Sequence, residues 1–159
     1  MRDRLRFRVG TAGVVVDLPG QEQEILSNLL SQLRDLVMVD HDPTLRRLKP
    51  PAHPGDEEAE AGYREMVDDQ LLRGRLESIE RVESGLGGTT LDEGDTGAWM
   101  HTLNSMRLIL GERLVLEGAD LEAHDLGEGT TGALYEWLGA LLEQLVGAAG
   151  AAEGGQPTR

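Results

Sequence analysis

Leucine, isoleucine and valine recur every three to four residues in four separate stretches of this 159-residue chain. This spacing matches the 3.6 residues per turn of an α-helix, so each stretch predicts an amphipathic helix with one face in a core. Segments rich in glycine and proline separate the stretches, which indicates that the helices fold back on one another. The expected helices cover residues 19–39, 62–85, 95–111 and about 130–149.

One segment near the start follows a different period. Leu5, Phe7 and Val9 alternate with arginines, and a Gly-Thr-Ala-Gly turn then leads into three valines. A period of two with a glycine turn predicts a β-hairpin over about residues 4–18, which must lie against helices because an isolated hairpin is only marginally stable. The predicted fold is therefore mainly α, with an N-terminal β-hairpin packed on a bundle of about four helices. We expect a single domain over residues 1–147, followed by a flexible tail over 148–159.

The charge balance argues against several classes of partner. Fifteen Lys and Arg against 29 Asp and Glu give a net charge of −14. Nucleic-acid binding and docking on anionic lipid both depend on clustered cations, so we expect neither direct nucleic-acid contact nor membrane binding. The absence of cysteine excludes disulfides and cysteine-based zinc sites. No signal peptide and no apolar run of about 20 residues are visible, so we expect a cytoplasmic protein.

The stretch REMVDDQLLRGRLESIERVE, residues 64–83, resembles a charged site at first reading. On a helical wheel its apolar residues gather on one side, and four charged residues of alternating sign, each four positions from the next, gather on the other. These four residues are Asp69, Arg73, Glu77 and Arg81. The spacing predicts a solvent-exposed ladder of ion pairs, each contributing ~0.2–0.5 kcal/mol.

Two charged residues of the same stretch, Asp68 and Arg75, project into the apolar side. A charge turned toward a core needs a partner, because an unpaired one is strongly destabilising or changes its protonation state. On the third helix, Asn104 and Arg107 flank the apolar stripe. We therefore predict a partly buried network of Asp68, Arg75, Asn104 and Arg107 between the second and third helices, which fixes helix register or lines a groove. The alternative is that Asp68, near the start of its helix, reaches water.

No established motif for catalysis or metal binding is present. The histidines at positions 41, 53, 101 and 124 form neither an HExxH motif nor a ligand pair on one helix, and no GxSxG or phosphate-binding loop occurs. We expect no catalytic residue, no metal site and no cofactor.

The last helix is apolar over much of its circumference, with Tyr135 and Trp137 on the flanks of a leucine line. Such a helix is either central to the core or shared with a second chain. The low aromatic content favours the core, since the fold then needs these leucines inside. Tyr135 and Trp137 are nevertheless candidate partner contacts, and a symmetric homodimer through this helix is the alternative.

A proline-rich segment from Asp42 to Pro54 separates the first two helices. Long irregular segments within compact domains are usually functional or disordered. Asp42 and Pro43 can start a turn, and Arg46 and Arg47 form a positive spot on an acidic protein. These four residues are candidate contacts for an acidic peptide or protein partner, and the alternative is a structural strap.

Three blocks carry a family resemblance. In order they are DPTLRRLKPPAHPGDEEAEAGYRE, AWMHTLNSMRLILGERL and YEWLGALLEQLV. Together they resemble an actinobacterial family catalogued as domain of unknown function 2017, over nearly the whole chain apart from the tail. The family's Asp-Pro-x-Leu-x-Arg-Leu pattern falls on residues 42–48, and its Asn-x-x-Arg pattern falls on Asn104 and Arg107. The resemblance implies no known activity; family members are often encoded near an adaptor of the Clp protease, and some carry a transcription-regulator label.

These observations favour a non-enzymatic protein-interaction or regulatory domain that forms a homodimer and binds a protein partner. A link to Clp-type proteolysis depends on the resemblance alone. The alternative is an enzyme or metal-binding protein that uses Asp68, Asn104 and Arg107 in a polar groove between the second and third helices.

Overall fold

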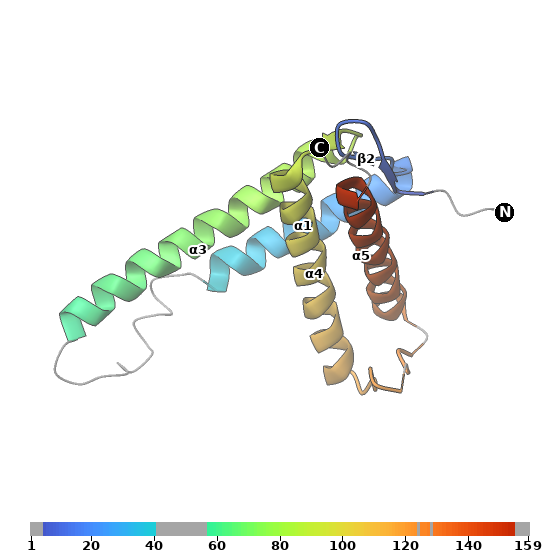
Figure 1. Ribbon diagram of the computed structural model, residues 1–159. Helices are drawn as coiled ribbons and strands as arrows, with labels where there is room; N and C mark the ends of the chain where they lie inside the picture. Colours follow the sequence, from blue (N-terminus) through green and yellow to red (C-terminus); the bar gives the residue numbers. More distant parts are fainter. Residues whose placement is uncertain (1–4, 41–56, 124, 128, 155–159) are drawn as a thin grey trace.

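The computed structural model describes residues 5–40, 57–123, 125–127 and 129–154 (Figure 1). In chain order these residues form β1 (Phe7–Val9), β2 (Val14–Val16), α1 (Gly20–Asp40), α3 (Glu57–Gly85), β3 (Thr90–Leu91), α4 (Glu93–Leu116) and α5 (Thr130–Gly154). The predicted fold, mainly α with an N-terminal hairpin packed on four helices, is confirmed.

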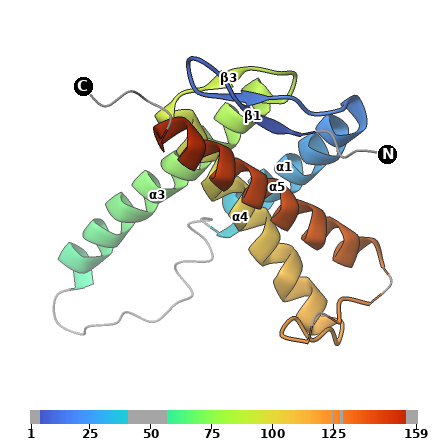
Figure 2. The same cartoon turned by 45° about the vertical axis from the view of Figure 1, so that its right-hand side comes forward.

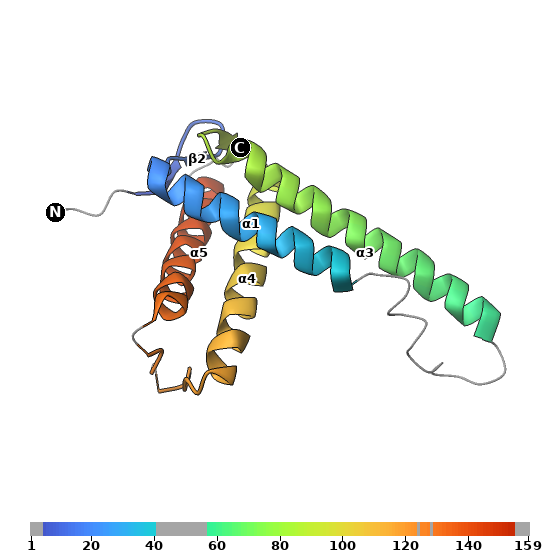
Figure 3. The same cartoon turned by 180° about the vertical axis from the view of Figure 1, so that it is seen from behind.

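The helices form two antiparallel pairs. α1 and α3 lie side by side, and α4 and α5 lie side by side, as the views from the front and from behind agree (Figures 1 and 3). The pairs meet where the end of α3 packs on the first half of α4, and they diverge from there, so the helices make a V. We call the closed end of this V the vertex. Arg34 of α1 forms an ion pair with Glu83 of α3, and its Nη1 donates to Glu83 Oε2 at 3.0 Å, which fixes one pair near the vertex.

A three-stranded antiparallel sheet in the order β1-β2-β3 covers the vertex, and α5 passes next to β1 (Figure 2). Val14 is paired with both Val9 and Leu91, so the hairpin is extended by β3. Gly13 has a φ of +144°, and a Cβ there would lie 2.3 Å from the carbonyl oxygen of Leu91. Only glycine therefore allows the hairpin turn to approach β3 so closely.

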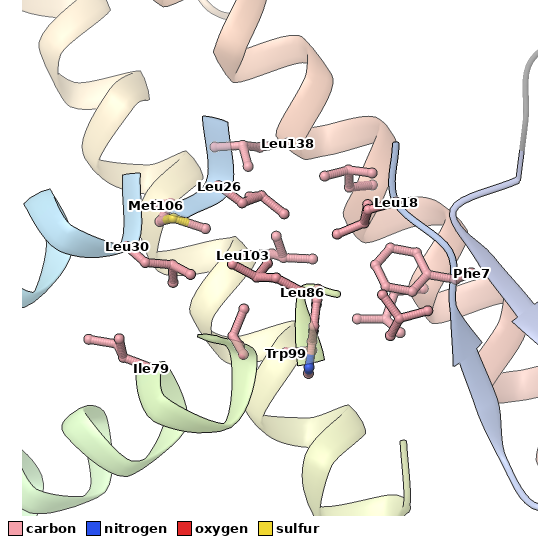
Figure 4. Close-up of a cluster of buried hydrophobic side chains, with 14 of the residues drawn as sticks. Phe7, Leu18, Leu26, Leu30, Ile79, Leu86, Trp99, Leu103, Met106 and Leu138 are labelled. Atoms are coloured by element: carbon pink, nitrogen blue, oxygen red, sulfur yellow. The ribbon is translucent and has the colours of Figure 1, made fainter. Parts of the chain in front are cut away.

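The core lies at the vertex. Trp99 of α4 is fully buried and packs edge-to-face on Phe7 of β1, with ring centroids 5.6 Å apart and an interplanar angle of 82°. Side chains from the hairpin and from all four described helices point toward a common centre (Figure 4). Those that contribute most are Phe7, Leu18, Leu26, Leu30, Ile79, Leu103 and Leu138.

Several boundaries differ from the sequence-based expectation. α3 begins at Glu57 instead of residue 62, and α4 continues to Leu116 through Gly111, where an end or a kink was expected. α5 continues to Gly154, so residues 148–154 of the expected tail are helical. The strand β3 lies in a glycine-rich segment expected to be a loop, because two residues are too short to show a period.

The start of α4 is one turn earlier than expected. The helix was expected to begin at residue 95, but Asp92 is its N-cap and accepts a hydrogen bond of 2.7 Å from the backbone N–H of Asp95. Asp95 in turn accepts from the backbone N–H of Asp92 at 3.4 Å, which completes a capping box.

None of the helices in the described part of the chain is long and apolar enough to span a bilayer.

Candidate functional site

Arg107, expected to join Asp68 between the second and third helices, instead faces α5. Its guanidinium carbon lies 5.2 Å from the ring centroid of Tyr135, and its Nη2 donates a hydrogen bond of 3.5 Å to the tyrosine hydroxyl. Arg107 therefore does not form the predicted network with Asp68. A helical wheel shows that Arg107 flanks the apolar stripe, but it does not show which neighbouring helix covers that flank. Asp68 and Asn104 are half-buried on α3 and α4, and Arg75 lies on the wall of a groove described below.

The polar cluster that does form joins the hairpin, α1 and α5. Arg6 donates to the Glu22 carboxylate from Nε at 3.0 Å and from Nη2 at 2.6 Å. Trp137 donates from its indole Nε1 to Glu22 Oε1 at 3.0 Å, and the backbone N–H of Arg6 donates to Gln144 Oε1 at 3.0 Å. In the sequence, Arg6 is one of the arginines that alternate with the apolar residues of the hairpin, and nothing near Glu22 indicates that the two residues meet. The one available signal was the indole N–H of Trp137, since a buried donor needs an acceptor.

Both aromatic partner-contact candidates are thus used inside the chain, Trp137 by Glu22 and Tyr135 by Arg107. The leucines Leu138, Leu141 and Leu145 are fully buried, so the last helix belongs to the core. The exposed face of α5 carries mostly acidic and small residues, with Val146 as its one large apolar side chain among the described residues, which does not favour a second chain there. The other candidates, Asp42, Pro43, Arg46 and Arg47, lie outside the described residues.

The charged face of α3 is exposed, as the wheel predicts, but its pairing differs. Asp69, Arg73, Glu77 and Arg81 are all exposed. Arg81 pairs with Asp95 of α4, 3.7 Å away, instead of with Glu77. These four charged residues therefore form a solvated surface, and Arg81 is the one that contacts α4 through an ion pair.

An apolar groove of about 480 Å³ lies in the angle between the α1–α3 pair and α4. Its apolar walls are formed by Leu33, Leu36 and Val37 of α1, Ile79 of α3, and Leu108 and Ile109 of α4. Leu36 is 45% exposed and Leu108 is 61% exposed, so two large apolar side chains from different helices face solvent at one site. Apolar surface gathered in a concave site commonly marks a binding surface.

The polar residues of the groove lie on two walls. Arg75 of α3 is half-buried, and Glu112, His101, Ser105 and the buried Thr102 come from α4. The Ser105 hydroxyl donates to the backbone carbonyl of His101 at 2.9 Å, so it is occupied within its own helix. Among the described residues, no group of three or more His, Asp or Glu side chains is placed to hold a metal ion.

A larger hollow of about 880 Å³ lies between the hairpin turn, the start of α4 and the end of α5. Small residues such as Gly10, Gly13 and Gly97 line much of it, together with the acidic residues Asp92, Glu93 and Glu153. Asp92 is already committed to the capping box of α4. The α1–α3–α4 groove, with its exposed leucines, is the stronger candidate site.

The model of one protein family, described as a domain of unknown function (DUF2017), matches residues 1–149. The chain belongs to the DUF2017 family. The resemblance seen in the sequence is thereby confirmed, and the family description carries no activity. The matched range includes the sheet, the Arg6–Glu22–Trp137 cluster and every residue of the groove, so all of these features belong to the DUF2017 domain. No curated protein and no solved structure gives a match.

Proposed function

We propose that this DUF2017 domain is a non-enzymatic protein-interaction or regulatory domain whose contact surface is the groove between α1, α3 and α4. The observation that carries the proposal is the exposure of Leu36 and Leu108 on different walls of one groove. Burying a leucine side chain on association stabilises a complex by roughly 1.5–3 kcal/mol. The charged residues Arg75 and Glu112 at the walls supply specificity to such a contact.

The overall charge also supports a protein partner. At −14, the chain repels nucleic acid and anionic lipid, whereas an apolar groove binds a protein segment without needing excess positive charge. What the family resemblance implies is that DUF2017 members are often encoded near an adaptor of the Clp protease. We therefore take a Clp-type protease or its adaptor as the first heterologous partner to test, with the domain in a regulatory role.

Site-specific photo-cross-linking tests the proposal. A photoreactive phenylalanine analogue is placed at Leu108 in the groove, and in a matched variant at Val146, which is 51% exposed on α5 and lies away from the groove. We expect capture of a protein from Leu108 and none from Val146. The captured protein is then purified and its Kd measured, and Leu108→Glu should weaken binding while Val146→Glu leaves it unchanged.

Equal capture from both positions, or a Kd that is insensitive to Leu108→Glu, would show that the groove is not the contact surface. Native mass spectrometry with elemental analysis of the same purified protein tests the alternative of an enzyme or metal-binding protein. A stoichiometric metal ion lost on Asp68→Ala or Glu112→Ala would replace the interaction proposal with that alternative.

A further inference from the structure

The charges of the groove indicate which protein occupies it. We infer that the occupant is a second copy of this chain, in a two-fold symmetric dimer in which Arg75 of each copy pairs with Glu112 of the other. This inference depends on the proposed interaction function, because it uses the same groove.

Arg75 is the first reason. It is half-buried on an apolar wall, and within the described part of the chain neither Arg75 nor Glu112 takes part in an ion pair. Arg6, Arg34 and Arg81, in contrast, each have a carboxylate partner in the fold. A guanidinium held at an apolar surface gains most from a carboxylate supplied from outside.

The two-fold symmetry is the second reason. In such an interface, if residue i of one copy contacts residue j of the other, then j also contacts i. A surface that carries one cation and one anion at separate places is therefore complementary to itself, and both charges are paired twice. A purely basic partner would leave Arg75 unpaired, and a purely acidic partner would leave Glu112 unpaired. Self-pairing satisfies both.

The spacing along α4 is the third reason. Leu108 and Val115 are seven residues apart, as are Ile109 and Leu116, and Leu108, Val115 and Leu116 are all largely exposed. Side chains seven residues apart lie on the same face of a helix, so these residues form an apolar seam along the end of α4. Glu112 lies in the middle of this seam, where a single charged position sets the register of the partner helix.

The shape of the molecule accommodates this contact. α4 projects from the vertex away from α1 and α3 (Figure 3), and the groove is lined by residues of all three helices. In the inferred dimer, the α4 face of each copy lies in the groove of the other. Each copy carries a net charge of −14, and the pairing of Arg75 with Glu112 gives a locally balanced contact. The remaining repulsion is screened beyond about 8 Å at physiological salt.

Sedimentation equilibrium of the full chain over micromolar to submillimolar concentrations tests the inference. We expect a dimer of twice the 17.3 kDa chain mass. Arg75→Glu and Glu112→Arg should each raise the dimer Kd by about tenfold or more, because each places two pairs of like charges in contact. The double variant R75E/E112R should recover the wild-type Kd within about threefold, because the exchanged charges pair again.

Matched controls lie on the exposed face of α3. Arg73→Glu and Glu77→Arg change the net charge by the same amounts but lie outside the groove, so the dimer Kd should stay within about twofold of the wild type. Circular dichroism confirms that each variant is folded. All four positions are exposed or half-buried, so none of the variants disturbs the core.

A wild-type chain that stays monomeric would overturn the inference. A dimer whose Kd is unchanged by both Arg75→Glu and Glu112→Arg would also overturn it. So would a double variant R75E/E112R whose dimer Kd is as high as that of the single variants. These outcomes are distinguishable from failure of the proposed function. A monomer that still captures another protein through Leu108 keeps the interaction function with a different occupant, and a monomer that captures nothing overturns both.

Discussion

The indole Nε1 of Trp137 donates a hydrogen bond of 3.0 Å to Glu22 Oε1, and this bond ties the first third of α5 to the first turn of α1. The same carboxylate accepts from the Arg6 guanidinium, so one side chain holds the hairpin and two helices together. The side chains of Arg6 and Glu22 are only 20% and 14% exposed. This cluster therefore stabilises the fold by joining the hairpin, α1 and α5.

Replacing Glu22 by alanine should destabilise the protein by about 2–3 kcal/mol, because two partly buried donors lose their acceptor. Trp137→Phe removes one donor and should cost about 1 kcal/mol from the lost hydrogen bond. Urea unfolding followed by circular dichroism measures both. Glu24→Ala, at an exposed position of the same helix, is the control and should stay within about 0.5 kcal/mol. Equal effects of the Glu22 and Glu24 variants would show that the cluster contributes nothing.

Thr102→Val should stabilise the protein. Thr102 is buried on α4, and its hydroxyl has no hydrogen-bond partner among the described residues. Valine has nearly the same shape and removes the unpaired group, for a gain of about 1 kcal/mol. The control is Thr96→Val on the same helix, where the hydroxyl donates to the backbone carbonyl of Asp92 at 2.7 Å. That variant should lose about 1 kcal/mol. The same direction of change in both would contradict the assignment.

Gly111→Ala should destabilise the contact between α4 and α5. A Cβ at Gly111 would lie 2.9 Å from Cε1 of Tyr135, so the ring would have to shift from its position beside Arg107. The cost of overpacking exceeds the gain in helix propensity, and we expect a net loss of about 1 kcal/mol. Gly97→Ala is the control, because α4 is exposed there and nothing lies within 4 Å of the added Cβ. Gly97→Ala should raise the free energy of unfolding by up to about 1 kcal/mol. A gain at both positions would rule out close packing at Gly111.

The capping box predicts how α4 responds to acid. The hydrogen bond from the backbone N–H of Asp95 lowers the pKa of Asp92 from its ordinary value. A carboxyl whose pKa is lower in the folded state stabilises the fold above its unfolded pKa, and this contribution is lost as the pH falls through the folded pKa. The Tm of the wild type should therefore fall more steeply below about pH 4 than the Tm of Asp92→Asn. Asparagine keeps the capping oxygen but does not titrate. If the Tm of the two proteins fell in parallel as the pH is lowered, Asp92 would not contribute to the acid sensitivity of the fold.

The helices could be predicted from the sequence because their apolar residues follow the helical period closely. The ends were harder to predict, since they depend on tertiary contacts. α4 continues through Gly111, and the Tyr135 ring occupies the space that a side chain at this position would take. Nothing near Gly111 in the sequence indicates this contact with α5. The strand β3 exists only because Val14 and Val15 of the hairpin lie beside it.

The polar contacts could not be predicted for a related reason. A wheel identifies the side of a helix on which Arg107 lies, but its neighbour Tyr135 is set by how α4 and α5 pack. Trp137 was a candidate partner contact because it flanks the leucine line of the last helix. Its acceptor, Glu22, could not be predicted because it lies in a distant segment of the chain. The groove was missed as an apolar site because its walls come from three helices, and no single helix shows it.

The convergence of both helix pairs on one buried centre has a mechanical consequence. A helix of 24 residues, such as α4, is about 36 Å long at 1.5 Å per residue. It acts as a lever, and a rotation of about 10° at its anchored end would carry its far tip about 6 Å. Packing around Trp99 therefore sets the angle between α4 and the α1–α3 pair, and with it the width of the groove.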